Sequence, residues 1–285
     1  MREGAGKMEP ERDRVGNGAN GNGVKSGVVK ILWTGGWDST YRLVELSRKL
    51  CTVQPFYVYG DGRYSEQYER QAMHKILHEL YNKEETRATI LPIKFVDKKS
   101  IPPNQEITKA YDLIFKETRL GSQHEWLARL AYTEPGLEIG TEHAPLEAHR
   151  VLTTIDKFGN IIKEKNGDGF VLDPDNSSKA VMLVLGKFRF PIIDKSGSDM
   201  VANIRLWGYE DIMKNVWFCH SPIFGKPCGF CHPCELKIET GMDFLFTGSA
   251  AFRRYARRNK KAFILNKIER KISRGFDKML SQHPK

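Results

Sequence analysis

The chain has 285 residues and a formal net charge of +10, with 40% hydrophobic and 28% charged residues. This length and composition are sufficient for a sizeable core and favour one large domain with appendages. No stretch approaches the roughly 20 uninterrupted apolar residues of a membrane span, and the N-terminus lacks the apolar segment of a secretory signal peptide. We therefore expect a cytoplasmic protein that does not bind a membrane.

The positive charge is concentrated at one end of the chain. Residues 250–285 contain twelve Lys or Arg side chains and two acidic ones, a balance of +10, so the other 249 residues are neutral overall. At the other end, residues 1–27 are rich in Gly, Asn and charged residues, which predicts a disordered N-terminal tail. The basic character thus belongs to a C-terminal tail and not to the body of the protein.

The first folded segment carries a glycine-rich turn. The apolar run Val28–Trp33 predicts a buried strand, and the helical spacing of apolar residues after Asp38 predicts a helix. Between them the chain reads Thr34-Gly-Gly-Trp-Asp-Ser-Thr40. Glycines let backbone N–H groups converge on an anion, the helix N-terminus adds partial positive charge, and the three hydroxyls can donate to phosphate oxygens. The turn therefore predicts a phosphate-binding loop, although an ordinary strand-to-helix turn has the same outline.

Two well-known phosphate motifs do not describe this turn. It has no Gly-Lys-Ser/Thr after four spacers, as a Walker loop has, and no Gly-x-Gly-x-x-Gly, as a dinucleotide-binding loop has. Its order of hydroxyl, Gly, Gly, any residue, Asp and Ser instead resembles the pyrophosphatase loop (PP-loop) of ATP-cleaving ligases.

Strands and helices alternate along the next part of the chain, which predicts an α/β fold with a Rossmann-like parallel sheet covered by helices on both faces. Ligands of such sheets bind at the carboxyl ends of the strands, where the glycine loop would lie. Expected strands are Val53–Tyr59, Thr89–Phe95, Leu137–Gly140 and Phe188–Ile193, and expected helices are Glu66–Tyr81, Ile107–Phe115, Gln123–Tyr132 and Asp199–Trp207.

One segment interrupts this alternation. Residues 153–185 include the turn sequence Lys157-Phe-Gly-Asn160, which predicts a β-hairpin inserted into the sheet topology.

A cysteine cluster follows in the loop at residues 217–236. Its members are Cys219, Cys228, Cys231 and Cys234. Four thiolates complete a tetrahedral zinc site with no open position, so the predicted Zn²⁺ is structural. An iron–sulfur cluster also uses four thiolates, and His220 and His232 are adjacent alternative ligands. The fifth cysteine, Cys51, is expected to pack in the core.

The glycine loop together with this cysteine spacing strongly resembles the 7-cyano-7-deazaguanine synthase family. Phe190-Pro-Ile-Ile-Asp194 and Val216-Trp-Phe-Cys219 are similar to further family segments, so the resemblance runs from about Val28 to Met242 and implies a synthase domain over residues 28–245. It implies a sheet of the PP-loop (HUP) type and the use of ATP and Mg²⁺ as well as Zn²⁺. Family members adenylate 7-carboxy-7-deazaguanine, convert it to an amide with ammonia, and dehydrate the amide to the nitrile.

The resemblance also implies roles for individual residues. Ser39 would hold the leaving pyrophosphate and Asp38 would help to position Mg²⁺, which makes these two residues the expected catalytic pair. Trp37 would add a flat surface near the nucleotide. The expected ATP-binding residues are Thr34, Gly35, Gly36, Trp37, Asp38, Ser39, Thr40 and Tyr59. Ser122, Gln123, Glu125 and Glu142 would read the edge of the deazaguanine substrate, although they are equally typical of helix starts and surface loops.

Several family residues are missing. Where the family has Gly-Arg-Asn, this chain has Gly121-Ser-Gln123; where it has Ser-Lys, this chain has Ser196-Gly197; and a Tyr-Pro-Asp-Cys-Arg segment expected after Gly140 is absent. The lost Arg and Lys side chains are natural partners of phosphate or carboxylate groups. Lys187, Lys195 and Arg119 are the candidates to replace them.

The acceptor amine stays open at this point. It is ammonia in the standard reaction, whereas similar proteins in anti-phage operons resemble enzymes that deliver the deazaguanine acyl group to an amine of a protein. A homodimer is expected in either case.

The C-terminal segment 246–285 reads as a basic amphipathic helix. Arg253, Arg254, Arg257 and Arg258 recur at three- and four-residue spacing, and Phe263, Ile264, Ile268 and Ile272 form an apolar stripe. Such a helix docks an acidic partner or a protein substrate, or forms a solvated face. Alternatively, the chain is a nucleic-acid-binding protein, in which this helix and the zinc loop together bind the phosphates of the nucleic acid.

Overall fold

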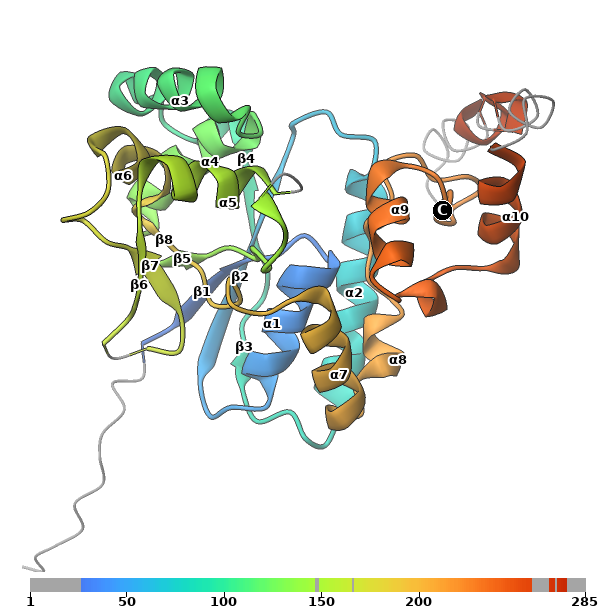
Figure 1. The fold of residues 1–285 in the computed structure, drawn as a ribbon. Helices are drawn as coiled ribbons and strands as arrows, with labels where there is room; N and C mark the ends of the chain where they lie inside the picture. The colour runs from blue at the N-terminus through green and yellow to red at the C-terminus, as the bar shows by residue number, and fades with distance from the viewer. Residues whose placement is uncertain (1–26, 147–148, 166, 258–266, 270, 276–285) are drawn as a thin grey trace, which may run out of the picture.

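The computed structural model describes residues 27–146, 149–165, 167–257, 267–269 and 271–275. Within this part of the chain, one parallel sheet has the order β3-β2-β1-β5-β8, and β4 also pairs with β2 (Figure 1). The predicted α/β fold with a Rossmann-like parallel sheet is therefore confirmed. The strands are β1 (Val29–Leu32), β2 (Thr52–Tyr59), β3 (Thr89–Ile90), β4 (Lys94–Asp97), β5 (Leu137–Glu138) and β8 (Phe188–Arg189).

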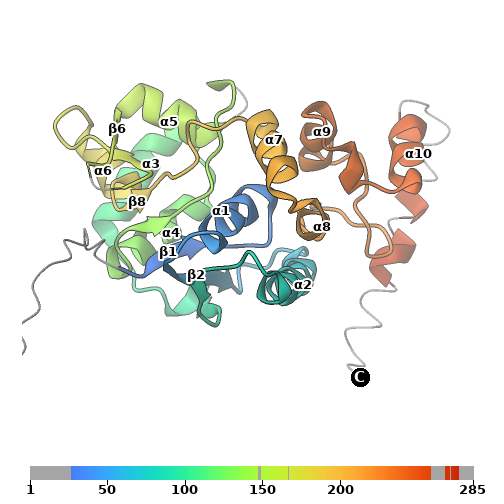
Figure 2. The ribbon, with the colours of Figure 1, turned by 90° about the horizontal axis from the view of Figure 1, so that it is seen from below.

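Helices cover both faces of the sheet (Figures 1 and 2). Strand β2 shows how the sequence produces two cores, because successive side chains of a strand point to opposite faces. Val53 and Tyr57 pack with the first helical layer, whereas Phe56 and Val58 pack with the second. The first layer contains α1 (Trp37–Ser47), α2 (Glu66–Asn82), α7 (Gly197–Trp207) and α8 (Glu210–Met213), and the second contains α3 (Gln105–Thr118), α4 (Gln123–Thr133), α5 (Arg150–Phe158) and α6 (Lys179–Leu185).

The strand order reverses beside β1. The chain passes from β1 to β2 through α1 on one face, and it reaches β5, the other neighbour of β1, through α3 and α4 on the opposite face. The loops after β1 and β5 therefore meet at the carboxyl ends of the strands, which is the usual ligand site of such sheets. They are in close contact, since a Cβ added to Gly140 would lie 2.9 Å from the backbone nitrogen of Ser39.

The edge of the sheet differs from the prediction. Thr89–Phe95 is not one strand, because β3 and β4 pair separately with the two halves of β2 and are divided by residues 91–93. Pro92 lacks the N–H that a continuous strand would need. Gln54 Nε2 instead donates to Pro92 O at 2.7 Å, which fastens the break to β2.

The segment 153–185 contains the predicted hairpin, formed by the antiparallel strands β6 (Ile161–Lys163) and β7 (Phe170–Leu172). The turn was predicted in the wrong place. Residues 157–160 end helix α5, and the hairpin turns between residues 163 and 170. The rest of the segment is mostly helical, and α6 packs against α3 and α4.

A buried ion cluster holds the hairpin turn. Arg42 is 2% exposed; it pairs with Glu138 at 2.8 Å and with Asp168 of the turn at 2.9 Å, and Asp168 also pairs with Lys49. Lys49 follows the C-terminal end of α1, whereas the glycine loop precedes this helix. The turn is therefore held at the end of the sheet opposite to the loop.

The C-terminal helices gather around the cysteines, in the orange and red part of Figure 1. These are α9 (His232–Glu239) and α10 (Gly248–Arg257), joined by a 3₁₀ turn at Asp243–Leu245; a second 3₁₀ turn lies at Lys98–Ser100. Among the described helices, none combines the length and apolar character needed to cross a bilayer.

Helix α10 is packed against the cysteine loop. Arg253 is 5% exposed and donates to the carbonyl oxygens of Cys228 and Pro227 at 3.2 and 3.1 Å. Arg253, expected on the basic side of an amphipathic helix, is therefore not available as a surface charge, because its guanidinium satisfies buried carbonyl groups. Arg258, Phe263 and Ile264 of the predicted amphipathic helix lie outside the described residues.

Candidate functional site

The glycine loop has a conformation that only glycine adopts easily. Gly35 has a φ of +70°, and a Cβ at this position would lie 3.1 Å from Met73 Cγ and 3.2 Å from Glu69 O, both on α2. Its carbonyl oxygen accepts a hydrogen bond of 2.8 Å from the backbone N–H of Trp217. The loop is thus held between α2 and the segment that leads into the cysteine cluster.

A cavity of about 270 Å³ opens beside this loop and is named here the loop cavity. Thr34, Gly36, Asp38 and Ser39 of the predicted ATP-binding set line it, together with Gln123 of the predicted substrate-binding set. The remaining walls come from the starts of α4 and α5 and from the segment after β5, through His124, Gly140, Thr141, His149 and Val151 among others.

Three helices begin at the loop cavity: α1, α4 and α5. The residues that precede them are Gly36, Ser122 and His149, and none of these side chains bonds a first-turn N–H group. Side-chain caps are present on α3, α6 and α7, whereas α2, α8 and α9 also lack one. The positive dipole ends of three helices therefore lie at one cavity, which suits it to a multiply charged anion. In α4 the N–H groups of His124 and Glu125 already bond the carbonyl oxygens of Gly121 and Ser122, so α1 and α5 are the helices that offer first-turn donors.

A second cavity of about 460 Å³ adjoins the first and is named here the wide cavity. The two share Leu32, Thr34, Gln123 and Leu127. Val58 and Trp126 add apolar surface to the wide cavity, and a charged group from the segment before α2 and the first turn of α2 adds polar surface. This combination of flat apolar walls and fixed charges suits an aromatic ring with polar edges.

The charged group of the wide cavity is centred on Glu69, which is 8% exposed. Its carboxylate accepts hydrogen bonds from Arg63 Nε at 2.9 Å, Ser65 Oγ at 2.7 Å and Tyr57 OH at 2.9 Å. Arg63 also pairs with Asp61 at 2.6 Å. Burial and the charge of Glu69 raise the pKa of the Tyr57 hydroxyl, which therefore stays protonated. The network fixes a guanidinium at the cavity wall.

Lys237, which the sequence analysis did not single out, lies next to the glycine loop. Lys237 of α9 is 9% exposed, and its Nζ lies 3.5 Å from Asp38 Oδ1 and 4.0 Å from Glu142 Oε1. Burial and the negative charge of Asp38 raise the pKa of Glu142 to about 7, although Lys237 opposes this shift. Within the described residues, Glu142 Oε2 is buried without a hydrogen-bond partner. Lys237 has no motif of its own, and its position three residues after Cys234 was the only available signal.

Two histidines line the loop cavity. His124 Nδ1 lies 3.0 Å from Gly121 O, and because a carbonyl oxygen only accepts, this nitrogen carries the proton. Burial lowers the pKa of His124 to about 4. Burial also lowers the pKa of His149, against the opposing charge of Asp38. His149 Nδ1 is buried and has no hydrogen-bond partner in the described part of the chain. Both rings are thus neutral at neutral pH.

Three residues of the predicted ATP-binding set are used elsewhere. The Trp37 ring is buried and packs edge-on against Phe244 at 6.1 Å, so the expectation that it offers a flat surface to the nucleotide is wrong. Thr40 Oγ1 accepts from Trp33 Nε1 at 3.0 Å. Tyr59 packs on the first helical layer and lines neither cavity. In each case the side chain points into the core on the α1 and α2 side of the sheet.

The predicted substrate-binding residues are only partly brought together. Gln123 lies on the wall between the two cavities, and Glu142 lies beside Asp38. Glu125 instead binds Arg129 at 3.0 Å and accepts from Thr108 at 2.7 Å, which joins α4 to α3. Ser122 precedes α4 and lines neither cavity. The same is true of the three residues expected to replace the missing Arg and Lys side chains: neither cavity is lined by Lys187, Lys195 or Arg119.

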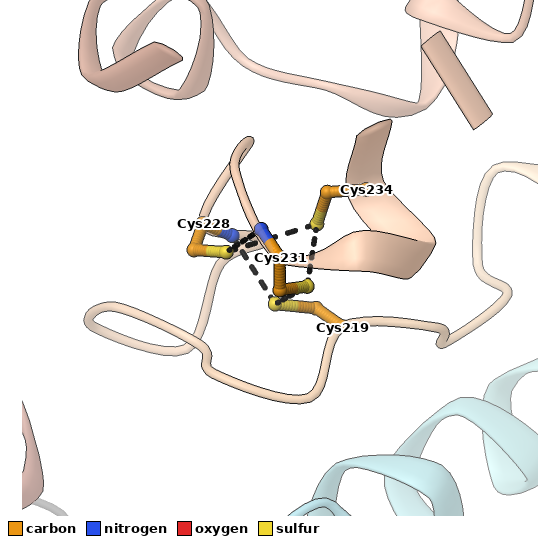
Figure 3. A group of neighbouring side chains, drawn as sticks. All are labelled: Cys219, Cys228, Cys231 and Cys234. Carbon is orange, nitrogen blue, oxygen red and sulfur yellow. Dashed lines mark hydrogen bonds between the residues drawn. The ribbon is translucent and has the colours of Figure 1, made fainter. Parts of the chain in front are cut away.

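The four predicted cysteines meet at one point (Figure 3). The Sγ atoms of Cys228 and Cys234 are 3.8 Å apart, and those of Cys219 and Cys231 are 3.9 Å apart. Four sulfurs at about 2.3 Å from a tetrahedral ion are separated by about 3.8 Å. The backbone N–H groups of Cys228 and Cys231 donate to sulfur at 3.2 and 3.3 Å, which orients the ligands. The cluster is therefore able to bind a metal ion. His220 lines the wide cavity instead.

No protein-family model matches the chain, and no curated protein matches its sequence. The parallel α/β sheet and the four-cysteine cluster therefore rest on the structure itself.

Proposed function

We propose that the chain is a cytoplasmic ATP-dependent ligase of the PP-loop type, which adenylates a 7-carboxy-7-deazaguanine-type carboxylate for attack by an amine. The observation that carries the proposal is the loop cavity. It lies where the strand order reverses, it receives three helix N-termini, and the hydroxyl groups of Thr34 and Ser39 are on its wall. Such a site favours a pyrophosphate group over a single small anion, because several separate donors can each bind a different oxygen.

The two adjoining cavities divide the substrates between them. We place the pyrophosphate of ATP in the loop cavity and the ring systems in the wide cavity, against Leu32, Val58 and Trp126. The reacting phosphorus then lies near the shared wall, where Thr34 and Gln123 are available to bind its oxygens. The Arg63 guanidinium, held by Glu69 and Asp61, places a fixed positive charge beside the ring systems.

The first step joins the two substrates. An oxygen of the substrate carboxylate attacks the α-phosphorus of ATP, the bond from this phosphorus to the bridging oxygen breaks, and pyrophosphate leaves. Negative charge accumulates on the departing oxygens, where the helix ends and the Ser39 hydroxyl stabilise it. No covalent intermediate with the protein forms, so the protein contributes alignment and charge neutralisation.

The second step forms the amide. The amine attacks the carbonyl carbon of the acyl-adenylate, AMP leaves, and the amine nitrogen loses a proton. The neutral imidazole of His149 accepts that proton, since its Nδ1 has no other partner among the described residues. The amine is ammonia or an amine of a partner protein. The described residues of β6 and β7 line neither cavity.

Two metal ions belong to the proposal. Asp38 fits a Mg²⁺ ligand, because its carboxylate is partly exposed and pairs only at 3.5 Å with Lys237; Mg²⁺ would neutralise phosphate charge there. The spacing and chemistry of the four cysteines fit Zn²⁺, which would stabilise the loop without an open coordination position. An iron–sulfur cluster, the alternative, would give visible absorption that zinc does not.

The proposal is tested by incubating the protein with Mg²⁺, ATP and 7-carboxy-7-deazaguanine, with and without ammonia. We expect AMP and pyrophosphate only when the carboxylate is present, and 7-deazaguanine, which lacks the carboxylate, is the matched control. Mass spectrometry then distinguishes a free amide or nitrile from a protein that carries a deazaguanine amide. Absence of carboxylate-dependent AMP would refute the proposed activity.

A further inference from the structure

The proposed function assigns no role to the buried side chain of Lys237. Lys237 is the residue of α9 that reaches the glycine loop, and its ammonium group lies 5.8 Å from the centre of the Trp37 ring as well as close to Asp38 and Glu142. Trp37 is the first residue of α1. The ammonium group is therefore positioned at the N-terminal end of the helix whose first turn lines the loop cavity.

The pairing of Lys237 is incomplete. An ammonium group has three donors, and its two carboxylate contacts of 3.5 and 4.0 Å are longer than the 2.7–2.9 Å typical of charge-assisted hydrogen bonds. A lysine that is buried to this degree normally has closely bonded partners, because removal from water is costly. Another group with strong acceptor oxygens would complete its coordination.

We propose that Lys237, which contacts Asp38 on the wall of the loop cavity but does not itself line that cavity, is a phosphate-binding residue at its edge, held there by the cysteine cluster. The ligand is the pyrophosphate group of ATP or free pyrophosphate. When this anion enters, the ammonium group binds its oxygens and releases Asp38. This residue would take the place of the Arg and Lys side chains that the chain lacks near Ser122 and Gly197, but it comes from a different part of the chain.

Two of the four cysteines lie at the start of α9, so a metal bound to the cluster would hold Lys237 in position. Cys231 precedes the helix, and Cys234 lies one turn before Lys237. A metal that fixes both sulfurs therefore fixes the first turn of α9 and the point from which the Lys237 side chain extends. Because the same loop also contacts the glycine loop through Trp217 and Gly35, the metal supports both sides of the anion site.

The experiment measures binding of Mg²⁺–pyrophosphate to the full-length, metal-loaded protein by calorimetry. Lys237→Met keeps most of the side-chain stem and removes the charge, and Lys237→Arg keeps the charge. Lys226→Met is the matched control, because Lys226 is an exposed lysine of the same cysteine loop. Loss of one charge-assisted bond predicts binding weaker by about 10- to 100-fold in Lys237→Met. We expect Lys237→Arg to recover most of the affinity and Lys226→Met to match the wild type.

A second variant keeps the lysine in place. Asp38→Asn removes its nearest counter-charge, so pyrophosphate without Mg²⁺ should bind more tightly than to the wild type, and this gain should vanish in the Asp38→Asn/Lys237→Met double variant. The gain in Asp38→Asn relative to the wild type can be measured even if Lys237→Met loses its metal or fails to fold, because the single variant keeps the native lysine. Absence of pyrophosphate binding by the wild type, equal affinities of Lys237→Met and Lys226→Met, or no gain in Asp38→Asn would each overturn the inference.

These measurements do not depend on the carboxylate substrate. Lys237-dependent pyrophosphate binding without carboxylate-dependent AMP formation would support this inference and refute the proposed ligase activity. AMP formation with unchanged pyrophosphate binding in Lys237→Met would do the reverse.

Discussion

The backbone N–H of Trp217 donates to the carbonyl oxygen of Gly35 at 2.8 Å, and the Trp217 ring stacks on Tyr68 of α2 at 4.6 Å. The segment that enters the cysteine cluster is therefore part of the wall that shapes the glycine loop. The four-cysteine cluster and the loop cavity are separate sites by sequence, but they share a structural support.

Removal of the metal should consequently affect more than stability. We expect Cys228→Ser to lose the metal, to unfold at a lower urea concentration, and to bind pyrophosphate more weakly, because α9 and Trp217 lose their fixed positions. Metal content by atomic emission, urea titration and calorimetry measure the three effects. Cys51→Ser is the control, since Cys51 lies outside the cluster and its thiol contacts Leu46 O. A Cys228→Ser protein that binds pyrophosphate as the wild type does would contradict the shared support.

Glu142 should make the protein less stable as the pH rises. Its pKa in the folded protein is about 7, against 4.5 for the free side chain, so the folded state holds the proton more tightly. Stability is therefore lost as pH rises from about 4.5 to 7. Glu142→Gln should raise the free energy of unfolding at pH 8 by about 1–3 kcal/mol and change it little at pH 5. Urea titrations at both pH values measure this. The exposed Glu239 is the control, and the idea fails if Glu239→Gln and Glu142→Gln behave alike.

His149 should separate the two steps of the proposed reaction. We expect His149→Gln to retain carboxylate-dependent exchange of pyrophosphate into ATP, because adenylation needs no proton acceptor, and to form amide about 10²–10⁴-fold more slowly. Radiolabelled exchange and mass spectrometry follow the two steps separately. His143 is exposed and lines neither cavity, so His143→Gln should leave both rates unchanged. Equal losses of exchange and amide formation in His149→Gln would assign His149 to binding instead.

Gly35 should be intolerant of a side chain for two separate reasons. Alanine at this position would have an unfavourable φ of +70° and a Cβ within 3.2 Å of Glu69 O. Gly62→Ala is the matched control, because Gly62 has a φ of +81° with no atom within 4 Å of an added Cβ. We expect only Gly35→Ala to abolish pyrophosphate binding, while both variants lose about 1 kcal/mol or more in urea unfolding. Similar pyrophosphate affinities of the two variants would show that the loop shape is not needed for binding.

The sequence was sufficient for features that depend on local patterns. Val28–Trp33 and Val53–Tyr59 were recognisable as strands because their apolar residues serve two buried faces, and the cysteine spacing identified the four residues that form a cluster able to bind a metal. The edge strand was predicted as continuous because the apolar run hides the effect of Pro92. That effect depends on pairing with β2, which a local pattern does not contain.

The errors and omissions at the site concern side-chain direction. Trp37 follows the two glycines, and only the packing of α1 against the C-terminal region turns its ring away from the cavities. Arg253 resembles a surface charge in sequence, but two carbonyl oxygens of the cysteine loop bind it. Lys237 is 199 residues from Asp38 along the chain, and their proximity depends on how the cysteine loop packs on the sheet.

The distance along the chain between Gly35 and its partner Trp217 has a consequence for synthesis. At about 5–20 residues per second, a ribosome needs roughly 10–40 s to add the intervening segment. During this interval the nascent chain already contains the glycine loop and the strands of the sheet in turn, but neither the donor to Gly35 O nor the ammonium group beside Asp38. The contacts of Trp217 with Gly35 and of Lys237 with Asp38 therefore form only after most of the polypeptide has been made, so the glycine loop reaches its final surroundings late in synthesis.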